Sequence, residues 1–444
     1  MPVDLSEVGK AYPYPAHGPR LLPWFGIWFA CCALGVPLTL LAWPANEPAS
    51  GPSFWCAVIG VPNFVFLALL CFARVGYEAL WTYAHNRNRT RAKRLAERLR
   101  IAQKSLQVLG VGYCVPSVTS NLADIVTEKK PLFKSQGPRD GVGHVVHNRF
   151  EEGAWSEEPM SVPELAAEWD DDHDSDPDNE PDTATPEPPR RIATAVLKLV
   201  NAIEPLVPVL QALSQYGPQY APIVRVLAPP DEADKAKQYA HDALRLAGLP
   251  ALDCTAVADA QGLMVADDWL DARERRALLV LAYAWHDTRP PERSSEATVA
   301  VLLNAGFYKL PESVQAVATL HRPIEDEAQV KTLRDLVLNA ALWGKTETRE
   351  ITHAWITRLD ADHDRTLLDE LKKSAFTGIA THETHRRLDR FVGDTHAATP
   401  WLSIAAAIQS GTTGPHLILD RTQASVLDVH QLPHDHPEQQ LEGA

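Results

Sequence analysis

Residues 21–43, LLPWFGIWFACCALGVPLTLLAW, contain no charged side chain, and residues 54–73, FWCAVIGVPNFVFLALLCFA, are uncharged as well. Each segment has about 20 residues or slightly more, the length that an α-helix needs to cross roughly 30 Å of hydrocarbon. A soluble core helix rarely needs so many consecutive apolar residues. We therefore predict a two-helix transmembrane hairpin within residues 21–81, which would hold the protein to a lipid bilayer.

The charges that flank the two apolar segments predict their orientation. The loop 44–53 has no Lys or Arg, whereas the stretch after the second segment has eight basic residues and only one acid, Glu97: Arg87, Arg89, Arg91, Lys93, Arg94, Arg98, Arg100 and Lys104. Because basic residues stay on the cytoplasmic side, we expect residues 1–20 and the C-terminus both to be cytoplasmic. The alternative, a cleaved signal peptide at residues 21–43, is disfavoured because a second apolar segment follows at once.

The net charge of −15 is concentrated in one stretch. Residues 151–189 contain fifteen of the 57 acids and no Lys or Arg, so the rest of the chain, with 42 acids and 42 basic residues, sums to zero. Such a segment buries too little apolar surface to offset the entropy of ordering it, which predicts a disordered acidic linker. Its core, DDDHDSDPDNE, lacks the glycine and the closing Glu of a calcium loop.

On either side of this linker the pattern changes. We expect residues 82–150 to contain a basic juxtamembrane helix, extending to about residue 107, and an irregular segment. Residues 190–430 alternate helical and strand patterns, which indicates a cytoplasmic domain with a mixed α/β sheet. Strands are predicted near 221–229, 251–257, 262–269, 295–307, 314–324, 416–420 and 425–429, and helices near 192–213, 232–249, 328–344, 367–380 and 400–411. Residues 431–444 form a polar tail.

Side chains that suggest chemistry are few. Asp360, Asp362 and Asp364 occupy calcium-loop positions, but Arg365 and Leu371 stand where Gly and Glu are needed, so helix capping is expected. His382 and His385 lack a third metal ligand. The sequence Gly344-Lys345-Thr346 lacks the glycine-rich lead of a phosphate loop. We therefore predict no catalytic, cofactor or metal site among these residues. No nucleic-acid partner is expected either, because aromatic residues do not accompany the basic helix.

Cys254, in ALDCTAVAD, is the one cysteine beyond the linker. A catalytic thiolate there would need a nearby cation or helix N-terminus to lower its pKa, and a histidine partner. The histidines available for that role are His286, His321, His353 and His396. A buried, unreactive cysteine in a strand is the more common situation. The six cysteines of the chain predict neither a disulfide framework nor a zinc site.

Several stretches resemble a known family. Residues 275–306 (RRALLVLAYAWHDTRPPERSSEATVAVLLNAG), 320–324 (LHRPI), 338–344 (LNAALWG) and 388–409 (LDRFVGDTHAATPWLSIAAAIQ) resemble thiolase-like accessory proteins of the bacterial type VI secretion system. The segment SLQVLGVGYCVP, after two apolar segments, is similar to the membrane-bound lipase-adaptor family of the same loci. These resemblances cover about residues 240–430 and 20–120.

The resemblance implies a thiolase-like domain without thiolase chemistry. ALDCTAVAD is not the small-residue elbow of these enzymes, and some 250 residues after the linker are few for their duplicated fold, which suggests a degenerate half or a remodelled version. It also implies an inner-membrane, non-enzymatic accessory protein of a Gram-negative bacterium that binds or loads a secreted effector or spike component, with the linker giving reach. The alternatives are a membrane-anchored acyl-transfer enzyme that uses Cys254 and a membrane-bound ligand sensor.

Overall fold

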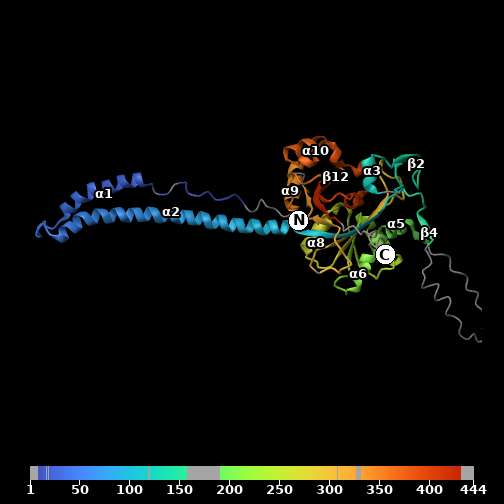
Figure 1. The fold of residues 1–444 in the computed structure, drawn as a ribbon, viewed down its shortest axis with the longest axis horizontal. Helices are drawn as coiled ribbons and strands as arrows, with labels where there is room; N and C mark the ends of the chain where they lie inside the picture. Colours follow the sequence, from blue (N-terminus) through green and yellow to red (C-terminus); the bar gives the residue numbers. More distant parts are fainter. Residues whose placement is uncertain are drawn as a thin grey trace, which may run out of the picture. The chain divides into compact units, whose positions relative to one another are not determined.

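The computed structural model describes residues 9–16, 18, 20–118, 121–157, 191–307, 309–326 and 332–431. The chain divides into a helical unit that ends at Ile101 and an α/β unit that begins at Ala102 (Figure 1). The mixed α/β domain predicted from the sequence is confirmed. Its boundaries differ from the predicted ones, since its first strand begins at Ser105.

The helical unit contains two long apolar helices, α1 (Leu21–Ala42) and α2 (Pro52–Ala102). Both begin close to the predicted apolar segments, and α2 continues without a break through the basic stretch. The Trp28 indole donates to Asn63 Oδ1 at 2.9 Å, which joins the two helices where both are otherwise apolar. A third helical stretch, Thr194–Gln215, is also long and apolar enough to cross a membrane, judged by length and composition alone. Membrane insertion itself remains a prediction.

The N-terminal segment lies along the basic part of α2. Arg91 Nε donates to Gly9 O at 2.8 Å, and the Asn88 side chain exchanges hydrogen bonds with the backbone of Tyr12. The Tyr12 and Tyr83 rings meet edge to face, with centroids 5.4 Å apart. Residues before α1 and residues after the apolar part of α2 are therefore neighbours.

The α/β unit is built on an eleven-stranded sheet whose first five-stranded half has the order β1-β9-β8-β6-β7. Within this half, β9 is antiparallel to β1 and β8, whereas β8, β6 and β7 are parallel. The strands are β1 (Ser105–Cys114), β6 (Ile223–Ala228), β7 (Asp253–Ala258), β8 (Leu278–Ala284) and β9 (Ala297–Asn304).

The second half repeats this arrangement with the order β10-β15-β14-β12-β13. Here β15 is antiparallel to β10 and β14, and β14, β12 and β13 are parallel. The strands are β10 (Ala318–His321), β12 (His353–Thr357), β13 (His385–Arg386), β14 (Gly414–Asp420) and β15 (Gln423–Val429), with β11 (Ile324–Glu325) paired to β15. The sheet is thus duplicated, and β1 joins β10 in an antiparallel pair centred on Leu106 and Leu320.

This duplication corrects two expectations. The domain is not a degenerate half, because each half has the same five-stranded order, as the thiolase-like resemblance implies for the full fold. It also begins at Ser105 rather than near residue 190, because β1 is a central strand. Residues 105–150 therefore belong to the α/β unit, where they also form α3 (Leu122–Glu128), β2 (Lys134–Gln136) and β3 (Val145–His147).

The predicted linker is an insertion within this unit. Its described ends lie in β4 (Trp155–Glu157) and β5 (Arg191–Ala193), which pair antiparallel, with Trp155 opposite Ala193. Because the two ends are hydrogen-bonded neighbours, the segment cannot extend the distance between the helical unit and the domain, and its predicted role as a tether is wrong. Residues 158–189, on which the prediction of disorder rests, and residues 432–444 of the tail lie outside the described residues.

Helices cover the sheet and fill its centre. On the first half, α5 (Thr194–Ile203) and α7 (Ala233–Leu246) pack together, and Gly112 of β1 lets α5 approach closely, since a Cβ there would lie 2.1 Å from Ala202 O. On the second half, α9 (Leu333–Trp343) packs on β15 and α10 (Ala361–Lys373) packs on α9. The apolar helix α12 (Thr399–Gln409) contacts strands of both halves, with Trp401 fully buried.

The prolines that were predicted to interrupt the helical segment 192–213 do so. Pro205 and Pro208 separate α5 from α6 (Val207–Gln215), as expected. Residues 262–269, expected as a strand, instead begin α8 (Met264–Ala272). The apolar run there reflects burial of most of a short helix, which its pattern does not distinguish from a buried strand.

Candidate functional site

The candidate site lies at the carboxyl ends of the parallel strands β12 and β14. Thr357 and Asp420 are the last residues of these strands and are register partners, and Arg358 follows directly. Ligands of open α/β sheets bind outside the carboxyl ends of the strands, so this edge is where functional side chains are expected. Arg358 has a left-handed backbone, with φ of +54°, which is unusual for a residue with a Cβ.

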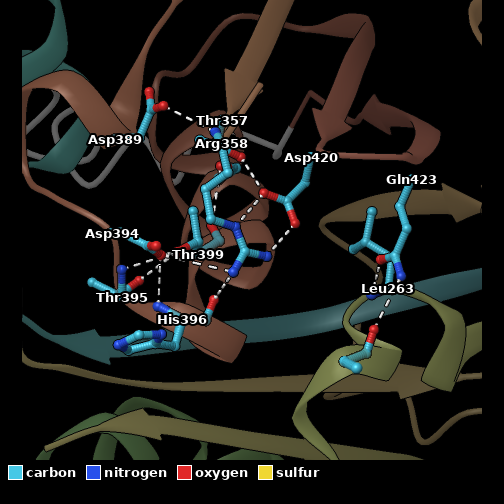
Figure 2. A network of polar contacts seen from close by, with 12 residues as sticks. Leu263, Thr357, Arg358, Asp389, Asp394, Thr395, His396, Thr399, Asp420 and Gln423 are labelled. Carbon is cyan, nitrogen blue, oxygen red and sulfur yellow. Dashed lines mark hydrogen bonds and ion pairs between the residues drawn. The ribbon is translucent and has the colours of Figure 1, made fainter. Parts of the chain in front are cut away.

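A buried ion pair occupies this position (Figure 2). Arg358 Nε donates to Asp420 Oδ1 at 2.8 Å, and Nη2 donates to Oδ2 of the same carboxylate. The side chains are 12% and 2% exposed, respectively. Burial acts to lower the pKa of Arg358, but the hydrogen bond to Asp420 and the neighbouring carboxylates outweigh it and raise that pKa. The guanidinium therefore stays charged and doubly bonded.

Three more groups complete the network around Arg358. Its Nη1 donates to His396 O at 2.8 Å and lies 3.7 Å from Asp394 Oδ1, while its backbone N–H donates to Asp389 Oδ2 at 2.9 Å. Burial raises the pKa of Asp389. Asp394 Oδ1 accepts from the backbone N–H of His396 at 2.9 Å. Arg358 thus links β12, β14 and the turn that leads into α12.

Gln423 holds a loop of the first half of the sheet, around Gly262, against the candidate site. Its Oε1 accepts from the backbone N–H of Leu263 at 2.8 Å, and its Nε2 donates to Gln261 O at 3.1 Å. Gly262 has φ of +47°, and a Cβ there would lie 2.6 Å from Gln423 Oε1, so this contact requires glycine. The site is therefore assembled from both halves of the sheet.

Two hollows flank Arg358 and share Arg421. The smaller, about 170 Å³, is bounded by the loop around Gly262 and by Gln423; the larger, about 730 Å³, opens beside Arg293 and Asp389. Among the described residues that line the smaller cavity there is no cysteine, serine or lysine. Arg358 and Asp420 are bonded to each other there, and the described lining also includes the hydroxyl of Thr422 and the imidazole of His396.

Cys254 lies away from this cavity. It is the second residue of β7, buried opposite Val224 of β6 in the apolar cluster that packs against α7. Burial, aided by the charge of Asp253, raises the pKa of its thiol to about 11. Within the described part of the chain no hydrogen bond joins it to a histidine. The expectation that this thiol is buried is confirmed, and its lack of reactivity stays a prediction.

The four candidate histidines are dispersed. His286 and His396 approach each other, with ring centroids 5.8 Å apart, and burial lowers the pKa of His286 to about 4. His353 stacks instead on His416, with centroids 5.1 Å apart. His321 lies at the end of β10, where burial lowers its pKa. Only His396 lines the cavity beside Arg358.

The other residues singled out in the sequence have structural roles. Asp360 caps α10, its Oδ1 accepting from the backbone N–H groups of Asp362 and His363, as predicted. Gly344, Lys345 and Thr346 close the C-terminus of α9. The His382 and His385 rings are 6.0 Å apart, and His385 bonds to Ile379 O. Among the described residues no group of three His, Cys, Asp or Glu side chains is placed to hold a metal ion.

The sequence did not reveal Arg358, Asp394, Asp420 or Gln423 as site residues. The segment HAWIT before Arg358 forms β12, which was not predicted, and the available signal was a short apolar run that ends in a charged residue. The same signal occurs in HLILD, which ends at Asp420 and was predicted as a strand. Only the parallel pairing of these strands places the two charges side by side.

No family model and no curated protein matches the chain. Solved structures with similarity include a ketosynthase of the bacillaene polyketide synthase from Bacillus amyloliquefaciens, with 9% identity, 73% of each chain covered and a TM-score of 0.48. An oxazolomycin ketosynthase domain from Streptomyces albus has 13% identity over 75% of this chain and 98% of that one, with a TM-score of 0.42.

The peroxisomal 3-ketoacyl-CoA thiolase of Saccharomyces cerevisiae is also similar, with 9% identity, 53% of this chain and 91% of that one covered, and a TM-score of 0.39. That thiolase is described as constructed from two core domains of identical topology. All three TM-scores are below 0.5.

Proposed function

We propose that the chain is a membrane-tethered, non-enzymatic binding protein whose α/β unit receives a protein partner beside Arg358. The observation that carries this proposal is the Arg358–Asp420 pair at the carboxyl ends of β12 and β14. A reactive site needs a nucleophile with a base that is free to take its proton. Here Arg358 and Asp420 are bonded to each other, and Thr422 is the one hydroxyl-bearing side chain among the described residues that line the cavity. Within the described part of the chain no hydrogen bond joins that hydroxyl to His396.

The energetics of the pair favour a permanent structural bond. Removing one partner of a buried ion pair leaves an uncompensated charge and costs about 3–5 kcal/mol. A reaction that required Arg358 and Asp420 to separate would have to overcome a free-energy cost of that size in each catalytic cycle. A binding surface does not require such a release, since the pair can stay closed while the neighbouring side chains contact a partner.

The alternative of an acyl-transfer enzyme would depend on Cys254. A nucleophilic cysteine has a lowered pKa and partial exposure, whereas Cys254 is buried and its pKa is raised to about 11. We test this alternative by incubating the detergent-solubilised full chain with a small acyl thioester and measuring intact mass. We expect no acyl adduct; an adduct that disappears in Cys254→Ala would refute the non-enzymatic proposal.

The membrane tether is supported by α1 and by the apolar first part of α2. Both are long and apolar enough to span a bilayer, and the basic residues follow only the second. We propose a bacterial inner membrane, with both termini cytoplasmic. A reporter active only in the cytoplasm, fused after Ala444, should be active. Activity of a periplasm-specific reporter at the same position would reverse the proposed orientation.

For the partner, we propose a secreted effector or spike component of a type VI secretion system, following the sequence resemblance. The test is pairwise: each protein encoded beside this gene is co-expressed with the full chain, and the complex is purified in detergent. One named neighbour should co-purify. If none does, the assignment to a secretion system is refuted. The mass measurement described above still tests whether the protein is non-enzymatic.

A further inference from the structure

The larger hollow beside Arg358, of about 730 Å³, adjoins a further cavity. It shares Arg390 with a neighbouring cavity of about 400 Å³, which is lined by α10, the end of α3 and α11 (Leu388–Phe391). The two hollows together are called the α11 groove. The cations that define it are Lys129, Arg293, Arg386, Arg387, Arg390 and Arg421.

Positive charge predominates along the α11 groove. Among the described residues, and counting Arg358, seven basic side chains line the two hollows, against five carboxylates. Within the part of the chain that the structure describes, Lys129, Arg293, Arg386 and Arg421 make no ion pair, whereas Arg387 and Arg390 share Asp364. On a chain with a net charge of −15, a row of unpaired cations is a surface that attracts a negatively charged ligand.

The backbone around the groove is held in an unusual conformation. Of nine described non-glycine residues with positive φ, four line the groove: Lys129, Arg293, Arg358 and Arg421, with φ between +54° and +59° for the first three and +51° for the last. Left-handed residues with a Cβ persist where the surrounding structure enforces them, and they cluster at ligand sites. Their concentration here, on cationic residues, indicates that these turns present the charges to one surface.

The distribution of charge points to spaced carboxylates rather than to a polyphosphate. The cations are spread over two hollows, one of which is also lined by Glu292, Asp389 and Asp394, and these carboxylates would repel the dense charge of a nucleic-acid backbone. Apart from histidines, Phe391 is the one aromatic side chain among the described lining residues, too few for base stacking. Leu367, Leu368 and Phe391 add an apolar floor at one end.

We propose that the α11 groove binds an acidic peptide segment of the partner protein, with an apolar side chain on the floor formed by Leu367, Leu368 and Phe391 and flanking carboxylates at the unpaired cations. This proposal rests on the proposed binding function and adds the chemistry of the segment recognised. Arginine is suited to the task because its planar guanidinium bonds a carboxylate at two points.

The test uses the full chain in a neutral detergent and a short fluorescein-labelled peptide in which a leucine is flanked by glutamates. Its matched control has glutamine at every glutamate position. Fluorescence anisotropy at low salt should detect binding of the glutamate peptide alone, weakening as salt is added. The double variant Arg293→Gln/Arg421→Gln should bind about tenfold or more weakly. Arg334→Gln, an exposed arginine on α9 outside the groove, should bind as the wild type does.

Equal binding of the two peptides, or wild-type affinity in the double variant with an unchanged melting temperature, would overturn the proposal. Binding to anionic lipid instead of the peptide would also overturn it. In that case vesicles containing phosphatidylserine would bind the wild type but not the double variant, and the glutamate peptide would not bind. The groove would then be assigned to lipid headgroups. If a partner protein still co-purifies with the double variant, the groove proposal fails while the binding function stands.

Discussion

Arg358 donates to both carboxylate oxygens of Asp420, from the residue that follows β12 to the last residue of β14. Thr357, one position before Arg358, is the register partner of Asp420 and also donates to it, at 2.7 Å. The pair therefore depends on the parallel register of two strands, β12 and β14, that are separated by α10, α11 and α12 in the chain. It is a sensitive reporter of the second half of the sheet.

Asp420→Asn should destabilise the α/β unit by about 3 kcal/mol, because the buried guanidinium of Arg358 loses its charged partner. The measurement is chemical denaturation of the full chain in detergent, followed by tryptophan fluorescence. Asp369→Asn, at an exposed position of α10, removes the same charge without a buried partner and should change stability little. A loss below about 1 kcal/mol in Asp420→Asn would show that the pair is not desolvated as described.

Cys254 should react very slowly with a charged thiol reagent at neutral pH. With a pKa of about 11, roughly one molecule in 3,000 carries the thiolate at pH 7.5, and the rate should rise about tenfold per pH unit below that pKa. Peptide mapping by mass spectrometry separates Cys254 from the five other cysteines. Rapid labelling that does not change between pH 7 and pH 9 would contradict the buried thiol.

The α/β unit should lose stability on mild acidification, in part through His416. Burial lowers the pKa of His416 to about 4, below the value near 6.5 expected in the unfolded chain. The unfolded state therefore binds the proton first, so stability is complete above pH 6.5 and declines as the pH falls toward 4. Between pH 7.5 and pH 5 this residue alone accounts for about 2 kcal/mol.

The matched variant for this prediction is His416→Gln. It should be less stable at pH 7.5, because the Trp355 indole loses its acceptor at His416 Nδ1, 3.2 Å away. Its free energy of unfolding should nevertheless vary less between pH 7.5 and pH 5 than that of the wild type. His286, whose pKa burial lowers to about 4, and His321, whose pKa burial also lowers, contribute to the acid sensitivity that remains. An equally steep pH profile in the variant would rule out His416 as a contributor.

Gly112→Ala should disrupt the contact between β1 and α5. The added Cβ would lie 2.1 Å from Ala202 O, which is backbone and cannot turn away. We expect a loss of about 1–3 kcal/mol or more, since overpacking forces the helix off the sheet. Gly137→Ala is the control within the same unit, because its Cβ would have no neighbour nearer than 3.8 Å. Similar melting temperatures for both variants would argue against β1 as a central strand.

Much of the local structure could be predicted from the sequence. The uncharged runs at 21–43 and 54–73, the strands IVRVLA and ATVAVLLN, and the proline break between α5 and α6 follow from patterns that are complete within a few residues. Hydrophobic periodicity and proline chemistry act locally, so a single sequence carries them. The strand β12 was missed because five residues, HAWIT, offer too short a pattern.

The duplication of the sheet could not be read in the same way. Val111 of β1 pairs with Val301 of β9, and Leu106 pairs with Leu320, across nearly half of the chain. Which strand pairs with which depends on packing of the whole sheet, and the acidic stretch between residues 151 and 189 hid the continuity of the domain. The candidate site could not be predicted for the same reason. Gln423 contacts Leu263 only when the two halves of the sheet are assembled.

The sequence by itself determined the two apolar helices, most of the local elements and the burial of Cys254, because composition and short-range pattern decide burial and helix or strand preference. The tertiary structure alone decided that residues 105–150 complete the domain, that the acidic segment is an insertion, and that Arg358, Asp420 and Gln423 form one site. The physical reason is that strand pairing joins residues far apart in the chain, and the charge of each side chain acquires its role only from the neighbour that pairing supplies.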